Sequence, residues 1–505
     1  MQIDVLKNAR RNISYGVVNR FIVLACPFVE RIFIHNILGA EYLGLGSLFS
    51  SIITVLSLTE MGFSGAMVYN MYKPAGEGDT ARMNALLNYY RRVYRLIGLI
   101  ILCVGLLLIP FLPGLIEGEP PAEIGLTKLY LIYLGNTALS YFLYAYMTSV
   151  IVVHQRDDVK SRVNSAVKIA LTATQIAVLL ITKNYYLFSL MMPVFTLVNN
   201  LWIGWRVHRL FPQYRPEGSL STKDRQDIRR LVTGTFIQEA CTVTRNSLDS
   251  ICISGFLGLT LTGIYNNYYL ILNGVTMFTG LVTAAFTGGI GNHVATKTVE
   301  ENYAEMKKLD FVYLWLGGWC MICLICLYQP FMRLWMGEDM LLPTSAVVLL
   351  GLYFYLLKLG DIRSMYTSAY GLWWEQRYRA IGETSMNVVL NIVLGKLFGI
   401  HGIILATMIS LFLCNYLWAA AITFRHYFTL AQLRDYYAYQ GKQSAITFIV
   451  AAGVCLLCAK LPIQGDIALL MARACICVTI PNLVNIAVYH RTDAFRYAKQ
   501  AIFRR

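Results

Sequence analysis

The stretch ISYGVVNRFIVLACPFVERIFIHNIL, residues 13–38, is apolar over a length that crosses a bilayer as a helix, yet it contains Arg20, Glu30 and Arg31. A charged side chain at the centre of an inserting helix costs roughly 2.5–3.5 kcal/mol. Charges at that depth normally face a cavity, a partner or a substrate instead of lipid. The sequence therefore predicts that this helix lines the functional part of a membrane protein.

Long apolar segments recur along the rest of the chain. Hydrophobic residues make up 57% of the 505 residues and charged residues only 14%, which is too apolar for an ordinary soluble protein. We therefore expect an all-α, polytopic membrane protein. Runs of about 20 apolar residues predict fourteen transmembrane helices, at 13–38, 43–68, 93–116, 126–153, 163–182, 184–207, 231–257, 262–290, 309–335, 342–372, 380–400, 402–425, 443–461 and 467–490.

The basic residues predict the orientation of these helices. Most of them fall in alternate loops, and the opposite loops hold only Lys128, Lys183, Arg333, Lys396 and Lys460. Because basic loops stay on the cytoplasmic side, both termini are expected in the cytoplasm. Insertion and contact with anionic lipid explain the net charge of +15, so no nucleic-acid partner is expected.

Two halves of the chain show weak similarity. Gly39 and Gly44 match Gly258 and Gly263 at one constant offset, each pair between the first two segments of a half. This order favours two parallel six-helix repeats around a central site, as in many transporters. Helix-start patterns occur at Ser221 to Asp224 and at Thr298 to Glu301. The predicted parts are an N-terminal six-helix lobe at 1–207, a basic cytoplasmic linker at 208–230, a C-terminal six-helix lobe at 231–428, and two additional helices with a basic cytoplasmic tail at 429–505.

The arginines within the apolar segments suggest an anion site. Arg20 and Arg31 are eleven residues apart, so they share one helix face at a separation of about 16 Å. Arg245 lies one turn before Asp249 on a later segment, and the repeat aligns Asp249 with Arg31. Guanidinium groups stay ionised and offer paired donors, which suits a phosphate. We therefore expect Arg20, Arg31 and Arg245 to line a substrate cavity.

Acidic residues within the same segments leave two interpretations open. They either neutralise the arginines in structural ion pairs or couple transport to a bound H+ or Na+, and Glu60 is expected at the depth of Arg20. These acidic residues are Glu30, Glu60, Glu239, Asp249 and Asp361.

A polar aromatic run in the segment 262–290 is a possible lining for sugars. Its amide and phenol groups could hydrogen-bond to sugar hydroxyls, or the tyrosines could instead mark a membrane-interface belt. The residues predicted to contact sugar are Asn266, Asn267, Tyr268 and Asn273.

All twelve cysteines fall inside predicted helices. The run Cys320, Cys323 and Cys326 and the pair Cys455 and Cys458 each lie within one apolar segment that has no nearby histidine. Thiols in such a setting usually pack as small hydrophobic groups, so the sequence predicts no metal site.

Several motifs resemble Wzx-type polysaccharide flippases, in the superfamily that also holds the lipid II flippases and the multidrug and toxin extruders. The resemblance runs through most of the first 430 residues. The motifs are Asn12-Ile13-Ser14 and the turn from Leu38 to Leu45, Glu60-Met61-Gly62-Phe63 leading to Tyr72-Lys73-Pro74, His154 to Asp158, Gln329 to Gly337, and Gly371 to Arg379.

This resemblance implies a V-shaped bundle of two six-helix lobes plus two extra helices, in a bacterial plasma membrane. It implies transfer of a lipid-linked oligosaccharide to the outer leaflet by alternating access, for lipopolysaccharide or capsule synthesis. A cationic cavity would hold the lipid pyrophosphate, with Arg20, Arg31 and Arg245 on the helices expected to line it. Membrane lipids and a polysaccharide polymerase or glycosyltransferases would be partners, and no cofactor beyond a coupling H+ or Na+ is expected.

Two other functions are alternatives. A multidrug or toxin extruder would share the fold, but its cationic substrates favour an acidic cavity. A membrane polymerase or glycosyltransferase would be expected to carry carboxylates on a large outer loop, and the longest such loops here are short. The sequence contains no recognisable nucleophile, metal cluster or phosphate loop, so we predict a transporter and not an enzyme.

Overall fold

The computed structural model describes residues 5–60 and 62–503, and over these residues it contains helices and turns but no strand. Residues 1–4 of the predicted N-terminal lobe, residue 61 of the motif at 60–63 and residues 504–505 of the predicted basic tail lie outside the described residues. The chain forms two compact units, Met1–Gly263 and Ile264–Arg505. The prediction of an all-α protein is confirmed.

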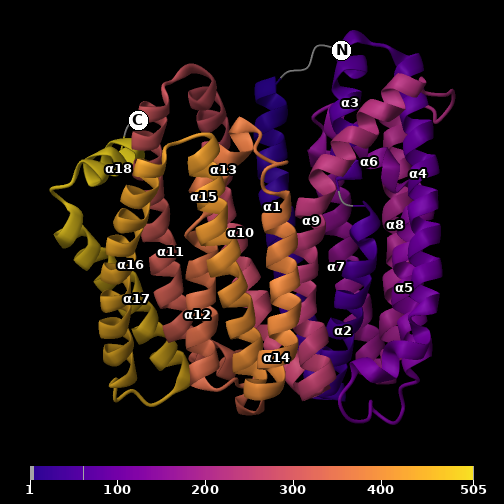
Figure 1. Ribbon diagram of the computed structural model, residues 1–505. Helices are drawn as coiled ribbons and strands as arrows, with labels where there is room; N and C mark the ends of the chain where they lie inside the picture. The colour runs from indigo at the N-terminus through magenta and orange to yellow at the C-terminus, as the bar shows by residue number, and fades with distance from the viewer. Residues whose placement is uncertain (1–4, 61, 504–505) are drawn as a thin grey trace. The chain divides into compact units, whose positions relative to one another are not determined.

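In the first unit α1 packs along α7, α7 packs along α8, and α2 contacts α9 (Figure 1). The helix α1 continues through Pro27 without interruption. The elements of this unit are α1 (Val5–Leu38), α2 (Ala40–Leu56), η1 (Ser57–Glu60), α3 (Phe63–Glu77), α4 (Thr80–Leu107), η2 (Ile109–Leu115), α5 (Leu126–Phe142), η3 (Tyr144–Met147), α6 (Thr148–Val153), α7 (Asp157–Thr182), α8 (Tyr185–Leu210) and α9 (Thr222–Leu257).

Three predicted segments of this unit are broken helices. The segment 43–68 divides into α2 and α3 at η1, where Gly62 takes a left-handed φ of 77° that favours glycine. The axis turns by 61° between α4 and η2, and by 49° between α5 and the helices η3 and α6. Apolar length therefore located the segments but not the breaks within them.

In the second unit α11 is the central helix and contacts α12, α16 and α17. The predicted segments 380–400 and 402–425 lie in the continuous run of helices α14, η5 and α15, and the chain turns within α14 at Gly399 (φ 58°, ψ −134°). The elements are α10 (Leu259–Thr296), which begins in the first unit, α11 (Val299–Met336), η4 (Glu338–Met340), α12 (Thr344–Lys358), α13 (Asp361–Tyr370), α14 (Arg377–Ser410), the π-helix η5 (Leu411–Trp418), α15 (Ala419–His426), α16 (Leu430–Ala459), α17 (Asp466–Tyr489) and α18 (Asp493–Phe503).

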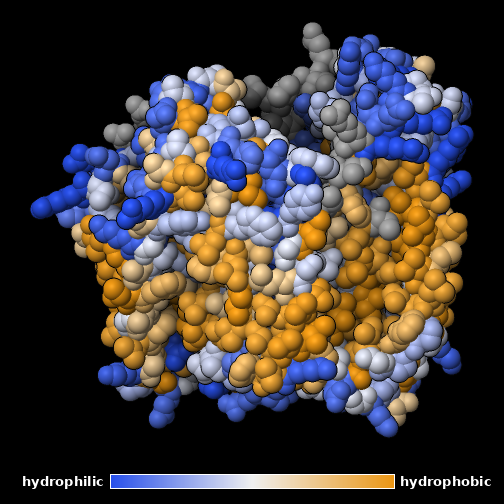
Figure 2. Space-filling model, in the orientation of Figure 1, coloured by the Kyte–Doolittle hydropathy of each residue, from blue (hydrophilic) through white to orange (hydrophobic). Residues whose placement is uncertain are grey.

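Among the described residues, nine helices are long and apolar enough to cross a membrane, or up to eleven if each bent pair is one span. The fourteen predicted segments also include α2, which is apolar but short, and α9, which is polar for a span. The stretch from Arg377 to His426 counts once although it holds two predicted segments. In Figure 2 apolar residues cover the middle of the helices and hydrophilic residues gather at their ends. The protein is a polytopic membrane protein.

Candidate functional site

Arg31 lies near several hydroxyl groups in the first unit. Its side chain is half-buried on α1, and its Nη2 donates to Ser47 Oγ on α2 at 3.4 Å. The hydroxyls of Tyr133 and Tyr185, 3.3 Å apart, belong to its electrostatic surroundings. Gly46 makes room for these phenols, because a Cβ there would lie 2.7 Å from the Tyr185 hydroxyl. Hydroxyl groups from α2, α5 and α8 thus lie in the surroundings of one guanidinium.

The other two predicted arginines differ in exposure. Arg20 is exposed on α1, whereas Arg245 is half-buried on α9, one turn before the buried Asp249. Glu239, earlier on α9, is exposed. Because α2 packs against both α1 and α9, it connects the helices that carry the three arginines. Whether these side chains bind a substrate stays a prediction.

Glu30 forms an ion pair across α1 and α7. Lys168 Nζ lies 2.7 Å from Glu30 Oε1, and the Thr172 hydroxyl donates to the same oxygen. Both charged side chains are largely buried, with exposed fractions of 24% and 14%. This contact agrees with the interpretation that the acidic residues neutralise basic residues in structural ion pairs.

Glu60 lies among phenol groups at the end of η1. The hydroxyls of Tyr94 and Tyr141 donate to its two carboxylate oxygens. Among the described contacts Glu60 therefore has tyrosine donors, and the structure does not bring it together with Arg20. Two phenol donors replace part of the hydration that a carboxylate loses when it leaves water.

In the second unit, Asp361 at the start of α13 pairs with Lys358 at 3.2 Å and accepts from the Tyr313 hydroxyl. Arg363 points elsewhere, because it lies two residues after Asp361 on α13 and so on another face of that helix. Its guanidinium donates to the carbonyls of Asn415 at 2.8 Å and Tyr416 at 3.0 Å. Both carbonyls belong to the π-helix η5, a conformation that often occurs at functional sites.

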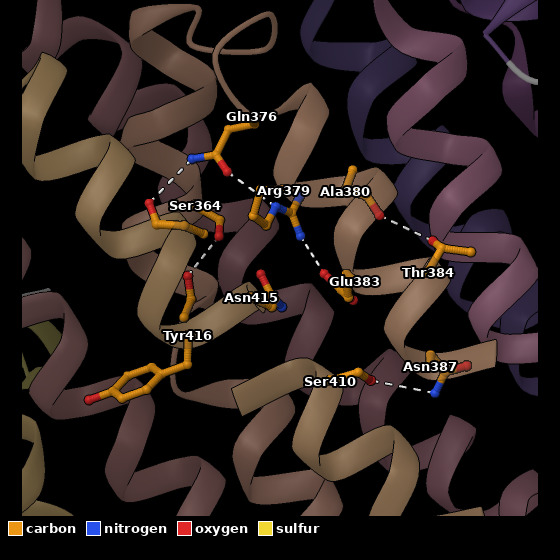
Figure 3. Close-up of polar contacts among 12 residues, drawn as sticks. Ser364, Gln376, Arg379, Ala380, Glu383, Thr384, Asn387, Ser410, Asn415 and Tyr416 are labelled. Atoms are coloured by element: carbon orange, nitrogen blue, oxygen red, sulfur yellow. Dashed lines mark hydrogen bonds and ion pairs between the residues drawn. The ribbon is translucent and has the colours of Figure 1, made fainter. Parts of the chain in front are cut away.

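Another cluster of polar side chains lies on α14, and its residues were not among the predicted site residues. Arg379 Nη1 lies 2.5 Å from Glu383 Oε2, and each side chain is 6% exposed. Farther along α14, Asn387 donates to Thr407 and Ser410, as Figure 3 shows in part. The i, i+4 spacing of Arg379 and Glu383 was visible in the sequence, but their burial was not.

The structure also reveals a caged carboxylate at the start of α7. Asp158 is fully buried, and three guanidinium groups lie against it, from Arg11 at 3.1 Å, Arg156 at 3.0 Å and Arg162 at 2.6 Å. The Asn12 side chain accepts from the Asp158 amide at 3.0 Å and so joins α1 to α7. The motif His154 to Asp158 pointed to this segment, but not to the partners from α1.

A large apolar groove lies within the second unit. Its volume is about 1120 Å³, and its walls come from α11, α12, α14, η5 and α16. Its few polar side chains are Tyr355, Tyr416, Tyr437 and Ser444, and the rest of the lining is almost entirely aliphatic or aromatic. Apolar composition alone could not predict this groove, because every membrane helix is apolar.

The polar aromatic run on α10 divides between core and surface. Tyr268 is fully buried, where its hydroxyl donates to Gln329 and accepts from the Leu342 amide. Asn267 is also buried, Asn266 is half-buried and Asn273 is exposed. The Tyr268 hydroxyl therefore has a structural role, and sugar contact by this run stays a prediction.

Solved structures share this fold, although no protein-family model and no curated protein matches the chain. The shared fold is a polytopic bundle of helices. The lipid II flippase MurJ, in its inward closed conformation, aligns with a TM-score of 0.69 and 15% identity, over 95% of this chain and 99% of that chain.

Two further structures belong to transporters. An inward-facing multidrug resistance MATE family transporter of the MOP superfamily aligns with a TM-score of 0.60 and 13% identity, over 83% of this chain and 96% of that chain. A MOP superfamily transporter from Pyrococcus furiosus aligns with a TM-score of 0.53 and 14% identity, with the same coverage of both chains. The predicted polytopic helical fold is thereby confirmed.

Proposed function

We propose that this protein is an alternating-access flippase that moves a polyprenyl-pyrophosphate-linked oligosaccharide from the cytoplasmic to the outer leaflet. The bacterial plasma membrane would be its site of action, and cell-surface polysaccharide synthesis its purpose. The shared fold supports a transporter or flippase of the MOP type. The choice of a lipid-linked substrate rests on the apolar groove of the second unit.

The groove suits a long hydrocarbon chain. Pockets for drug-sized ligands measure roughly 300–1,000 Å³, and this groove measures about 1120 Å³ with an almost wholly apolar lining. One of its walls is α16, which lies beyond the predicted twelve-helix repeat. An isoprenoid tail bound there would bury apolar surface without leaving polar groups unpaired.

The arginines of the first unit would bind the pyrophosphate. Arg31 combines a permanent charge with neighbouring hydroxyl donors, which can pair with several phosphate oxygens at once. Exposed Arg20 would attract the headgroup, and Arg245 would complete the site from α9. Asn273, the exposed member of the α10 run, is the best placed of that run to contact sugar.

A coupling ion, H+ or Na+, would act at a carboxylate of α9. Two of the predicted acidic residues lie on α9, the exposed Glu239 and the buried Asp249, which follows Arg245 by one turn. A buried carboxylate one turn from a substrate-binding arginine is a suitable place for ion binding to oppose or favour substrate release.

Transport in proteoliposomes tests the proposed substrate class. The purified protein is reconstituted with a fluorescent polyprenyl-pyrophosphate-linked oligosaccharide, and an impermeant glycosidase added outside reports the headgroups that have crossed. Protein-dependent transfer supports the proposal. Extrusion of a cationic dye without transfer of the lipid-linked sugar would instead establish the multidrug alternative.

A further inference from the structure

Five cysteines from three helices meet in the second unit. Cys326 on α11, Cys458 on α16 and Cys477 on α17 are buried, and their Sγ atoms all lie within 4.8 Å of one another. Cys455 Sγ lies 3.6 Å from Cys326 Sγ. Cys323 also contacts Cys477. These five residues are the thiol cluster.

Helix geometry explains how the cluster assembles. Cys323 and Cys326 are three residues apart on α11, as are Cys455 and Cys458 on α16, so each pair lies on one side of its helix. α11 contacts both α16 and α17, and α17 contributes Cys477. The sequence places the cysteines within separate helices, and only the packing of those helices brings them together.

The sulfur separations match a metal coordination sphere. A zinc–thiolate bond is about 2.3 Å, so two thiolates of a tetrahedral site are about 3.8 Å apart. The observed 3.6 Å and the limit of 4.8 Å lie close to that value. Small rotations about χ1 would bring the cysteine sulfurs to bonding positions around one ion.

A basic residue lies beside the cluster. Arg473 on α17 donates from Nη1 to the Cys326 carbonyl at 3.2 Å, and its charge acts on Cys455. Thiolates buried in an apolar environment need compensating positive charge. A bound metal ion and Arg473 would together supply that charge.

We propose that the thiol cluster is a binding site for a soft d10 metal ion, Cu+ or Zn2+. Thiolate ligands select these ions, and no carboxylate or imidazole belongs to the described group. Each bound thiol would release its proton to solvent as the metal–sulfur bond forms, so affinity rises with pH. The proposal does not depend on the transported substrate.

The site would also stabilise one wall of the apolar groove. Cys455 belongs to the thiol cluster and also lines the groove. A metal ion bridging α11, α16 and α17 would fix α16 against α11. We therefore expect the metal to raise the thermal stability of the protein.

Metal titration of the full-length protein in detergent tests this site. Reduced, metal-free protein is titrated separately with Zn2+ and with Cu+ against a chromophoric chelator, and Co2+ is used to detect thiolate charge-transfer absorption. We expect one equivalent of Zn2+ or Cu+ per chain and a higher unfolding temperature. Cys326→Ser and Cys477→Ser should each weaken binding by about 100-fold or more, since even outer-shell changes cost 10–100-fold.

Cys320→Ser is the matched control, because Cys320 is buried on the same helix but outside the group. Gel filtration checks that each variant is folded, and only monodisperse variants are compared. Absence of binding by the wild type, or equal weakening in the control, would overturn the proposal. Mass spectrometry of unreduced protein would detect a Cys326–Cys455 disulfide. If the cluster forms this disulfide and binds no metal when metal is supplied, the proposal is also overturned.

Discussion

Replacing Asp158 with Asn should destabilise the first unit strongly while preserving the shape of the side chain. The buried carboxylate balances three arginines whose exposed fractions are 26%, 19% and 46%. Loss of one partner of a buried ion pair costs about 3–5 kcal/mol. Because water can reach the arginines in part, we expect the cost to fall to about 2–4 kcal/mol.

Thermal unfolding of the purified protein in detergent measures this cost. At about 2.1 cal/mol/K of unfolding entropy per residue, a loss of that size lowers the unfolding temperature of the first unit, Met1–Gly263, by about 4–7 °C. Asp157→Asn is the matched control, because Asp157 precedes Asp158 in the same first helical turn but is only half-buried. It should lower the unfolding temperature by less than half as much.

A second variant tests the electrostatic cause. In the Asp158→Asn background, Arg162→Gln removes one of the cations left without its carboxylate, so part of the lost stability should return. The double-mutant cycle would then give a coupling between the two residues that exceeds 0.5 kcal/mol. Wild-type stability in Asp158→Asn, or strictly additive effects in the cycle, would refute the idea that this carboxylate holds the arginines together.

Three further changes have defined outcomes. Gly44→Ala would place a Cβ 1.9 Å from the Leu259 carbonyl oxygen, so α2 must shift and thermal unfolding should show a loss of about 1–3 kcal/mol; wild-type stability would contradict this close approach. Burial lowers the pKa of His154 below its ordinary value of 6.5, so its contribution to stability is complete above pH 6.5 and decreases below it. His154→Gln should therefore reduce the pH dependence of the unfolding temperature between pH 5 and 6.5. An unchanged profile would contradict this. Gly441→Phe should fill the groove and slow transport of the lipid-linked oligosaccharide by about tenfold or more. Gly453→Phe, on the same helix but outside the groove lining, should not slow transport. Equal transport by the two variants would contradict the role of the groove.

Much of the architecture could be predicted from the sequence because apolar length and capping are local properties. Thr298 and Glu301 form the predicted capping box, and the Ser221 side chain accepts from the Asp224 amide as expected. Breaks within apolar segments were harder to predict. The bend between α4 and η2, for example, falls where Pro110 lies in the first turn of η2, a local signal that a scan for apolar length does not use.

The partners of buried charges could not be predicted, because they depend on which helices meet. Glu30 faces Lys168 on a helix far along the chain, and Glu60 accepts from two tyrosines. The same reason applies to the thiol cluster, whose members are separated by up to 154 residues, from Cys323 to Cys477. Residue types were visible in the sequence, whereas their distances follow from tertiary packing.

The central claim is that Arg31 binds the pyrophosphate of a lipid-linked oligosaccharide. Transfer of that lipid to the outer face of proteoliposomes, measured for the wild type and Arg31→Gln, tests it most directly. Exposed Arg92, neutralised as Arg92→Gln, is the control. Loss of a charge-assisted hydrogen bond costs about 1.5–3 kcal/mol, so Arg31→Gln should slow transfer roughly 10- to 100-fold while Arg92→Gln leaves it near wild type. Wild-type transfer by a correctly folded Arg31→Gln variant would contradict the account.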